Sequence, residues 1–214
     1  QGYKENDPMG GHDPYSSSKG CAELVTLAYR RSFLQDQGVS LASVRAGNVI
    51  GGGDWADDRL IPDILRSFEK NKPVVIRNPK ATRPWQHVLE PLSGYLVLAQ
   101  KMYNNHKEYA EGWNFGPREE DVKPVDWILD KMISKWPDSS WELDQNSNPH
   151  EAGFLKLDIS KAESKLGWKP VWELSYTLEK IIAWQKAWLN KEDMQVACLA
   201  EIEEYTKEMS NENR

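Results

Sequence analysis

Short apolar segments alternate with longer amphipathic segments along most of this chain. Apolar runs of strand length occupy residues 40–45, 74–76, 113–115 and 155–157. Helical patterns occupy residues 14–37, 60–69, 89–104, 124–136, 160–166 and 175–190, and an acidic helix over 192–214 frays into a polar tail. Because alternating strands and helices build sheets that helices cover, the pattern predicts an α/β fold.

Three segments between these elements are predicted to be loops. Residues 1–13 are polar, residues 47–58 are rich in glycine, and residues 77–87 combine charged side chains with two prolines. Gly38 and Gly167 each follow a helical pattern, and glycine is the residue that most often ends a helix. We therefore expect helices to end at both positions.

The composition narrows the classes of function. The chain has 33 acidic and 27 basic residues, a net charge of −6, whereas a nucleic-acid-binding protein is usually basic. There is no apolar run of about 18 residues, which a membrane-spanning helix needs, and the first residues do not resemble a signal peptide. Cys21 and Cys198 offer neither metal-ligand spacing nor a disulfide framework. The sequence thus predicts a cytoplasmic protein without nucleic-acid, membrane or metal partners.

Tyr15 and Lys19 are the first candidate catalytic residues. They stand four positions apart on the first predicted helix, so their side chains share one face. There the lysine ammonium can stabilise the phenolate, which makes the phenol a usable acid or base. The spacing alone is not specific, because the pairs Tyr103/Lys107 and Tyr176/Lys180 repeat it. Only the first pair encloses small residues, Ser16–Ser18, and only that pair follows a loop rich in glycine and proline.

Polar and basic residues downstream are candidates for contact with a ligand. Asn48 opens the glycine-rich loop after a strand, where glycines allow close approach, although the loop lacks the ending of a P-loop and could be a flexible turn. A guanidinium suits phosphate oxygens, so Arg45, Arg59, Arg77 and Arg83 are candidates for a diphosphate, with simple surface solvation as the alternative. The histidines His12, His87 and His150 show no zinc spacing.

Taken in order, these segments resemble the extended short-chain dehydrogenase/reductase family, in its nucleotide-sugar branch. The matching stretches are residues 15–19, 43–51, 83–88, 113–116 and 166–170, which together reach across nearly the whole chain. The resemblance implies the C-terminal part of a Rossmann-type extended fold plus a smaller mixed α/β substrate-binding domain.

Three domains or parts follow from this resemblance. We expect a residual Rossmann part over residues 1–48, with the Tyr15–Lys19 helix and the following strand. Residues 49–190 would form mainly the sugar-nucleotide-binding domain, with some elements returning to the Rossmann part, and residues 191–214 a C-terminal helix and polar tail. The family's glycine-rich loop precedes the Tyr-Lys helix, so the chain is expected to be a fragment without the N-terminal NAD-binding segment.

The resemblance also implies an activity and its cofactor. Tyr15 and Lys19 would be catalytic and, with Arg45, would contact NAD. The implied reaction is dehydration of a nucleotide-bound glucose to its 4-keto-6-deoxy form, and residues 43–55, 77–95 and 149–152 favour CDP-glucose as substrate. Another nucleotide-sugar dehydratase, a 4-epimerase, or a non-catalytic nucleotide-sugar-binding fragment remain alternatives.

The same resemblance assigns the substrate-binding residues and an assembly. The implied substrate contacts are Asn48, Arg59, Leu60, Arg77, Arg83, His87, His150 and Glu151. The Tyr-Lys helix usually pairs with its counterpart in this family, so a homodimer of the full-length protein is expected. An apolar stripe of Leu24, Leu27 and Ala28 is compatible with that pairing, but burial against the chain's own sheet is the plainer explanation.

Overall fold

The computed structural model describes residues 2–11, 13–104, 107–146 and 154–212. The chain divides into two compact units whose segments interleave along the sequence. Unit 1 contains Gln1–Ala46, Pro91–Gly116 and Leu157–Lys169, and unit 2 contains Gly47–Glu90, Pro117–Lys156 and Pro170–Arg214. The predicted division into a residual Rossmann part and a sugar-nucleotide-binding domain stays a prediction.

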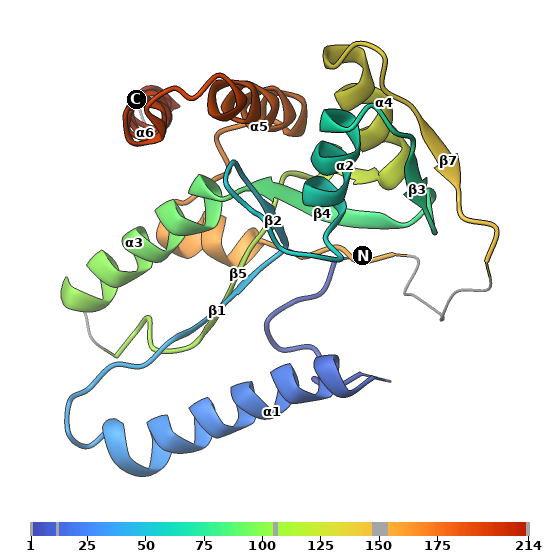
Figure 1. Ribbon diagram of the computed structural model, residues 1–214. Helices are drawn as coiled ribbons and strands as arrows, with labels where there is room; N and C mark the ends of the chain where they lie inside the picture. Colours follow the sequence, from blue (N-terminus) through green and yellow to red (C-terminus); the bar gives the residue numbers. More distant parts are fainter. Residues whose placement is uncertain (1, 12, 105–106, 147–153, 213–214) are drawn as a thin grey trace. The chain divides into compact units, whose positions relative to one another are not determined.

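Unit 1 is built on two parallel strands and the helices around them (Figure 1). Strand β1 (Ser43–Ala46) pairs with β5 (Gly112–Phe115), so that Ser43 faces Gly112 and Ala46 faces Phe115. Helix α1 (Pro14–Tyr29) continues into a π-helical segment, η1 (Arg30–Leu34). The α-helix α3 (Leu89–Asn104) and the π-helical segment η3 (Ala162–Leu166) complete the unit, apart from the first two residues of α3, which belong to unit 2.

Large aromatic residues form the core of unit 1. Trp113 and Phe115 of β5 are fully buried, and Phe115 meets Trp168 edge to face with ring centroids 5.0 Å apart. The cluster also includes Leu98, Ala162 and Leu166. Successive residues of a strand face opposite sides, so residues two apart share a side, and β5 presents Trp113 and Phe115 together to this core.

Unit 2 contains a three-stranded sheet and a separate strand pair. The sheet has the order β2 (Asn48–Ile50), β4 (Thr82–His87) and β6 (Val122–Pro124), with β2 parallel and β6 antiparallel to β4. The pair consists of β3 (Val74–Ile76) and β7 (Trp141–Leu143), which run parallel.

Among the described residues, four α-helices belong to unit 2, and three of them supply most of its largest buried cluster. They are α2 (Leu60–Glu69), α4 (Val125–Lys135), α5 (Leu174–Leu189) and α6 (Met194–Glu212), with a short 3-10 helix, η2 (Glu119–Asp121), before β6. Ile64, Ile128 and Ile181, from three of these helices, are fully buried in one cluster. This cluster fixes α2, α4 and α5 on each other.

The predicted α/β fold is confirmed, and most predicted helices have the expected position. Leu89–Asn104 agrees at both ends, and Leu60–Glu69 does as well. Gly167 ends η3 with φ of 72°, the left-handed conformation that glycine adopts without a steric penalty.

Three strand predictions need correction. Residues 77–87 were expected to be a loop, but Thr82–His87 form β4, the central strand of the unit 2 sheet. Asn48–Ile50, inside the expected glycine-rich loop, form β2. The expected strand at residues 155–157 is only an isolated bridge between Tyr3 and Leu157. In each case the pairing partner, which local sequence does not reveal, decides whether a short segment becomes a strand.

Candidate active site

The start of α1 is held by a side-chain cap. The carboxylate of Asp13 accepts hydrogen bonds from the backbone N–H of Ser16 (2.9 Å) and from its hydroxyl (2.7 Å). These bonds lower the pKa of Asp13 below its ordinary value. Pro14 occupies the first helical position, where a missing N–H costs nothing. The cap thus fixes the start of the helix and with it the positions of the Tyr15 and Lys19 side chains.

Tyr15 and Lys19 lie together on an open face of α1. The Lys19 ammonium is 5.3 Å from the centroid of the Tyr15 ring, and the Tyr15 side chain is 68% exposed. The hydroxyl of Ser17 donates to the Gly11 carbonyl (3.2 Å), and that of Ser18 donates to the Tyr15 carbonyl (2.7 Å). The serine hydroxyls are thus bonded to the backbone, and these short side chains add little bulk beside the phenol and the ammonium.

The other two Tyr-Lys pairs have different surroundings. The hydroxyl of Tyr176 and the ammonium of Lys180 both contact the carboxylate of Glu204 on α6. These two contacts lower the pKa of Glu204, Lys180 contributing more. Tyr103 lies near the end of α3 with its ring 81% exposed. The Tyr176 pair therefore joins α5 to α6 through a carboxylate, whereas Tyr15 is exposed beside Lys19 on one helix.

Arg45, the predicted cofactor contact, is engaged inside unit 1. Its Nε donates to Glu23 of α1 at 2.7 Å, and its Nη1 donates to the backbone carbonyl of Glu5 at 3.2 Å. Glu23 also accepts from the Ser43 hydroxyl at 2.6 Å. Hydrogen bonding from Arg45 lowers the pKa of the Glu23 carboxyl. Arg45 thus ties α1 to β1, and its contact with a cofactor stays a prediction.

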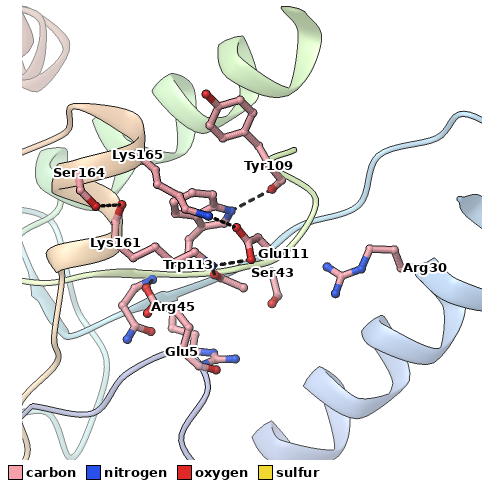
Figure 2. A network of polar contacts seen from close by, with 12 residues as sticks. Glu5, Arg30, Ser43, Arg45, Tyr109, Glu111, Trp113, Lys161, Ser164 and Lys165 are labelled. Atoms are coloured by element: carbon pink, nitrogen blue, oxygen red, sulfur yellow. Dashed lines mark hydrogen bonds and ion pairs between the residues drawn. The ribbon is translucent and has the colours of Figure 1, made fainter. Parts of the chain in front are cut away.

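A second polar group of unit 1 surrounds β5. Lys161, just before η3, and Lys165 of η3 both contact the Glu111 carboxylate, at 3.0 and 3.2 Å, beside the Trp113 indole (Figure 2). The Lys161 ammonium also lies 4.4 Å from the Trp113 ring centroid and donates to the Gly112 carbonyl. These contacts attach η3 to β5, so this polar group has a structural role.

Three predicted substrate residues of unit 2 lie around one turn. Arg59 is exposed and immediately precedes α2, whose first residue, Leu60, packs on the hydrophobic core. Arg77 follows β3, and its guanidinium is 4.0 Å from the carboxylate of Asp58. Asp58 therefore links Arg59, its neighbour in sequence, to Arg77, its ion-pair partner. The structure brings these two arginines to the same end of α2.

Asn48 and Arg83 lie on adjacent strands of the same sheet. Asn48 of β2 is the register partner of Trp85 on β4, and Arg83 stands two residues before Trp85. Both side chains are half-buried, and Arg83 donates to the Thr82 carbonyl at 3.1 Å. Their contact with a substrate stays a prediction, as it does for Arg59, Leu60 and Arg77.

His87 occupies the interior of unit 2 rather than a surface. Its side chain is 0% exposed, its Nδ1 accepts from the backbone N–H of Leu89, and its ring meets Trp172 edge to face. Burial, aided by the Lys180 charge, lowers the pKa of His87 to about 4. The imidazole is enclosed by unit 2, and the contact of His87 with a substrate stays a prediction.

Sequence reasoning missed the buried carboxylate next to this histidine. Glu90 is 0% exposed, and burial raises its pKa. It accepts from the backbone N–H groups of Val171 (3.0 Å) and Trp172 (2.7 Å) and from the Tyr205 hydroxyl (2.7 Å). Glu90 therefore joins the start of α3 to α6 and to the segment before α5. The partners are about 80 or more positions away, so no local pattern identifies this role.

Two predicted substrate residues, His150 and Glu151, lie outside the described residues. Within the part of the chain that the structure describes, no group of three His, Cys, Asp or Glu side chains is arranged to hold a metal ion. No helix there is long and apolar enough to cross a membrane.

Known proteins resemble the chain over nearly its whole length. The family described as GDP-mannose 4,6 dehydratase matches residues 1–181. The CDP-glucose 4,6-dehydratase of Salmonella typhimurium is 61% identical over 95% of the chain, and this match covers 58% of the Salmonella protein. The Escherichia coli dTDP-glucose 4,6-dehydratase is 24% identical over 88% of the chain and is covered over 53% of its length.

The fold has solved counterparts as well. The Bacillus anthracis dTDP-glucose 4,6-dehydratase, crystallised with NAD, superposes with a TM-score of 0.70 at 19% identity. The match covers 87% of this chain and 56% of that one. The chain thus spans little more than half the length of the proteins it matches, and it shares their fold. It belongs to the GDP-mannose 4,6-dehydratase family of extended short-chain dehydrogenase/reductases.

Proposed function

We propose that the protein that contains this chain dehydrates CDP-glucose to CDP-4-keto-6-deoxyglucose with NAD as cofactor. The observation that carries the proposal is the 61% identity over 95% of the chain with the Salmonella CDP-glucose 4,6-dehydratase. The exposed Tyr15 and Lys19 pair on α1 supplies the acid–base chemistry that such a reaction begins with.

The surface around Tyr15 fits a flat dinucleotide. The phenol is exposed, Lys19 offers a cationic donor beside it, and Ser16–Ser18 add little bulk to the helix. When bound, NAD supplies the hydride acceptor and later the hydride donor. Tyr15 and Lys19 would contact it, whereas the Arg45 guanidinium already bonds to Glu23 and Glu5.

The chain's own residues would carry the proton transfer. The phenol oxygen of Tyr15 takes the proton from the glucose 4-hydroxyl as that carbon is oxidised. The Lys19 ammonium stabilises the phenolate before the transfer, because opposite charges at short range favour each other. The 4-ketone so formed acidifies the proton at C5, which allows water to leave from C5 and C6.

The nucleotide would be held by unit 2. Asn48 and Arg83 lie on neighbouring strands, while Arg77 pairs with Asp58, the residue that precedes Arg59. A forked guanidinium matches two phosphate oxygens at once, so these arginines suit the CDP diphosphate. Leu60 would line the cytosine-ribose end, and His150 and Glu151 would lie near the hexose.

Turnover by the protein expressed from its complete reading frame tests the proposal. It is incubated with CDP-glucose and with dTDP-glucose, and the 4-keto product is measured. We expect turnover of CDP-glucose, and we expect Tyr15→Phe to lower kcat by roughly 10²–10⁴-fold because it removes the acid–base group. Tyr103→Phe is the matched control, since Tyr103 has the same spacing to a lysine and is also exposed; its activity should equal that of the wild type.

Other results would contradict the proposal. Turnover of dTDP-glucose alone would assign the protein to another dehydratase, and inversion at C4 without loss of water would make it a 4-epimerase. If the full-length protein bound CDP-glucose in calorimetry but did not convert it, the protein would be a non-catalytic nucleotide-sugar-binding protein.

The proposal includes the homodimer expected of the full-length protein. Its support is the exposed face of α1, where none of the residues is buried within unit 1. The cytoplasmic setting and the absence of nucleic-acid and membrane partners stay predictions from the sequence.

A further inference from the structure

The glycine-rich segment after β2 packs against an indole from a distant helix. A Cβ atom on Gly52 would lie 2.2 Å from Cγ of Trp184, and one on Gly53 would lie 3.2 Å from its Cζ2. Gly53 also has φ of 76°, which other residues rarely adopt. The indole of Trp184, on α5, therefore occupies the space that these two glycines leave open.

The second half of this segment, which spans residues 51–58, is contacted by side chains of α5 and α2. The ring of Trp55 contacts the rings of Trp184 and Trp188, with centroids 6.1 and 4.7 Å apart. Arg66 of α2 donates to the backbone carbonyls of Trp55 (3.2 Å) and Ala56 (3.1 Å). Both α5 and α2 thus fix the course of residues 51–58, which would otherwise be a glycine-rich loop with many conformations.

The ends of this segment lead directly to predicted substrate residues. Asn48 lies on β2 just before the glycines, and Arg59 follows Asp58 at the start of α2. Asp58 itself pairs with Arg77. The conformation of residues 51–58 therefore sets where these groups stand relative to each other, and a preorganised site binds more tightly than one that must be ordered by its ligand.

We propose that Trp184 is a positioning residue for the nucleotide diphosphate, acting through its packing on Gly52 and Gly53. The inference rests on the proposed function, because it requires that Asn48, Arg59 and Arg77 bind that ligand. Trp184 stands more than 100 positions after these residues in the sequence, on a helix for which no substrate contact is predicted.

The test compares CDP binding by Trp184→Ala and by Trp188→Ala, measured by calorimetry on the full-length protein. Trp188 is the matched control: it is on the same helix and also contacts Trp55, while the glycines pack on Trp184. We expect Trp184→Ala to weaken CDP binding by roughly tenfold, the scale of ordering a few residues on binding. Trp188→Ala removes a contact with Trp55 and leaves the packing on the glycines, so it should weaken CDP binding clearly less than Trp184→Ala does, and Trp184→Phe should also weaken it less.

Hydrogen exchange separates positioning from a general loss of stability. In Trp184→Ala, the amides of residues 51–58 should exchange faster, while those of β3 and β7 should keep their protection. Gly52→Ala provides a second readout, since the added methyl group collides with Trp184. It should weaken CDP binding strongly beside Trp184 and also in the Trp184→Phe background, because phenylalanine keeps Cγ and both Cδ atoms, which the methyl group meets. In the Trp184→Ala background the effect should be much smaller.

The outcomes distinguish this inference from the proposed function. If Trp184→Ala binds CDP as the wild type does, or if Gly52→Ala is equally harmful in the wild-type and Trp184→Ala backgrounds, the inference is wrong and the proposed function stands. If the wild type binds neither CDP nor CDP-glucose, both are wrong. Should Trp184→Ala fail to fold, Gly52→Ala in the wild-type protein gives the decision. Weaker CDP binding with faster exchange of residues 51–58 supports the inference, and unchanged CDP binding overturns it.

Discussion

At the scale of single residues, His87 makes the stability of unit 2 depend on pH. Burial and the Lys180 charge hold its folded pKa at about 4, below the ordinary value of 6.5. The unfolded chain takes up this proton near pH 6.5, and the folded chain does so only near pH 4. Stability from the neutral imidazole is therefore complete above pH 6.5 and is lost as the pH falls toward 4.

The expected loss of stability in acid can be measured by comparing the wild type with His87→Asn. The difference between pKa 6.5 and about 4 corresponds to roughly 3 kcal/mol of unfolding free energy. In His87→Asn the amide oxygen can replace Nδ1 as the acceptor for the Leu89 N–H. Denaturant unfolding between pH 7 and 4 should show a smaller acid loss for the variant. Because Glu90 and Glu201 also titrate nearby, the difference between the two proteins is the quantity to measure; parallel curves would contradict the prediction.

The same residue shows where sequence reasoning reached its limit. Tyr15, Lys19 and the cap region were identified because their contacts lie within a few positions along the chain. His87 was assigned to the substrate by the family resemblance of its segment, whereas its surroundings include Lys180 of α5 and Glu201 of α6. Burial is a property of long-range packing, which a short motif does not contain.

At the scale of elements, α1 is attached to unit 1 by polar contacts. None of its residues is buried, whereas Glu23 bonds to Ser43 and Arg45 on β1. Arg30, which follows α1, donates to the Leu41 carbonyl at 3.2 Å. Hydrogen bonds to charged groups each contribute about 1.5–3 kcal/mol when they are shielded from water. The Glu23 side chain is only 17% exposed, so its removal should lower the unfolding free energy measurably.

We therefore expect Glu23→Ala to lower the unfolding free energy of unit 1 by roughly 2 kcal/mol. Hydrogen exchange of α1 and β1 should increase, because the variant leaves the Arg45 guanidinium without its carboxylate. Lys165→Ala is the control, since its ion pair with Glu111 involves a lysine that is 52% exposed. Such pairs contribute at most about 1 kcal/mol. An equal effect of the two substitutions would show that α1 is held by something other than Glu23.

The elements themselves were predicted unevenly. Helices with a clear apolar period, such as α2 and α3, were placed to the residue. Strands β2, β6 and β7 have three residues each, too few to show an alternation, and β6 ends in Pro124. Their pairing depends on β4 and β3, which lie far away in the sequence. Periodicity thus finds the long helices and an apolar run finds β3, whereas β2, β4, β6 and β7 are revealed only by their partners in the assembled sheets.

At the scale of the whole molecule, α1 and η1 leave apolar side chains in contact with solvent. The exposed residues are Leu24, Val25, Tyr29 and Phe33. Val25, Tyr29 and Phe33 follow each other at intervals of four, so they share one face, and the rings of Tyr29 and Phe33 meet with centroids 5.3 Å apart. Contiguous apolar surface of this kind favours association with another protein surface. Of the two explanations for an apolar stripe on this helix, burial within unit 1 is not observed for any residue of α1.

We expect the chain to associate through this face. Light scattering should show a mass that rises with protein concentration toward that of a dimer. Phe33→Lys and Val25→Lys should each keep the chain monomeric, since a charge on the face must lose its water when two copies meet. Both residues are exposed, so neither substitution should disturb the fold of a single chain.

Leu96→Lys tests whether any exposed leucine acts in the same way: Leu96 is 73% exposed on α3, and its substitution should leave association unchanged. A wild-type chain that stays monomeric at high concentration, or a Leu96→Lys variant that dissociates as fully as Phe33→Lys, would show that the face of α1 is not the contact.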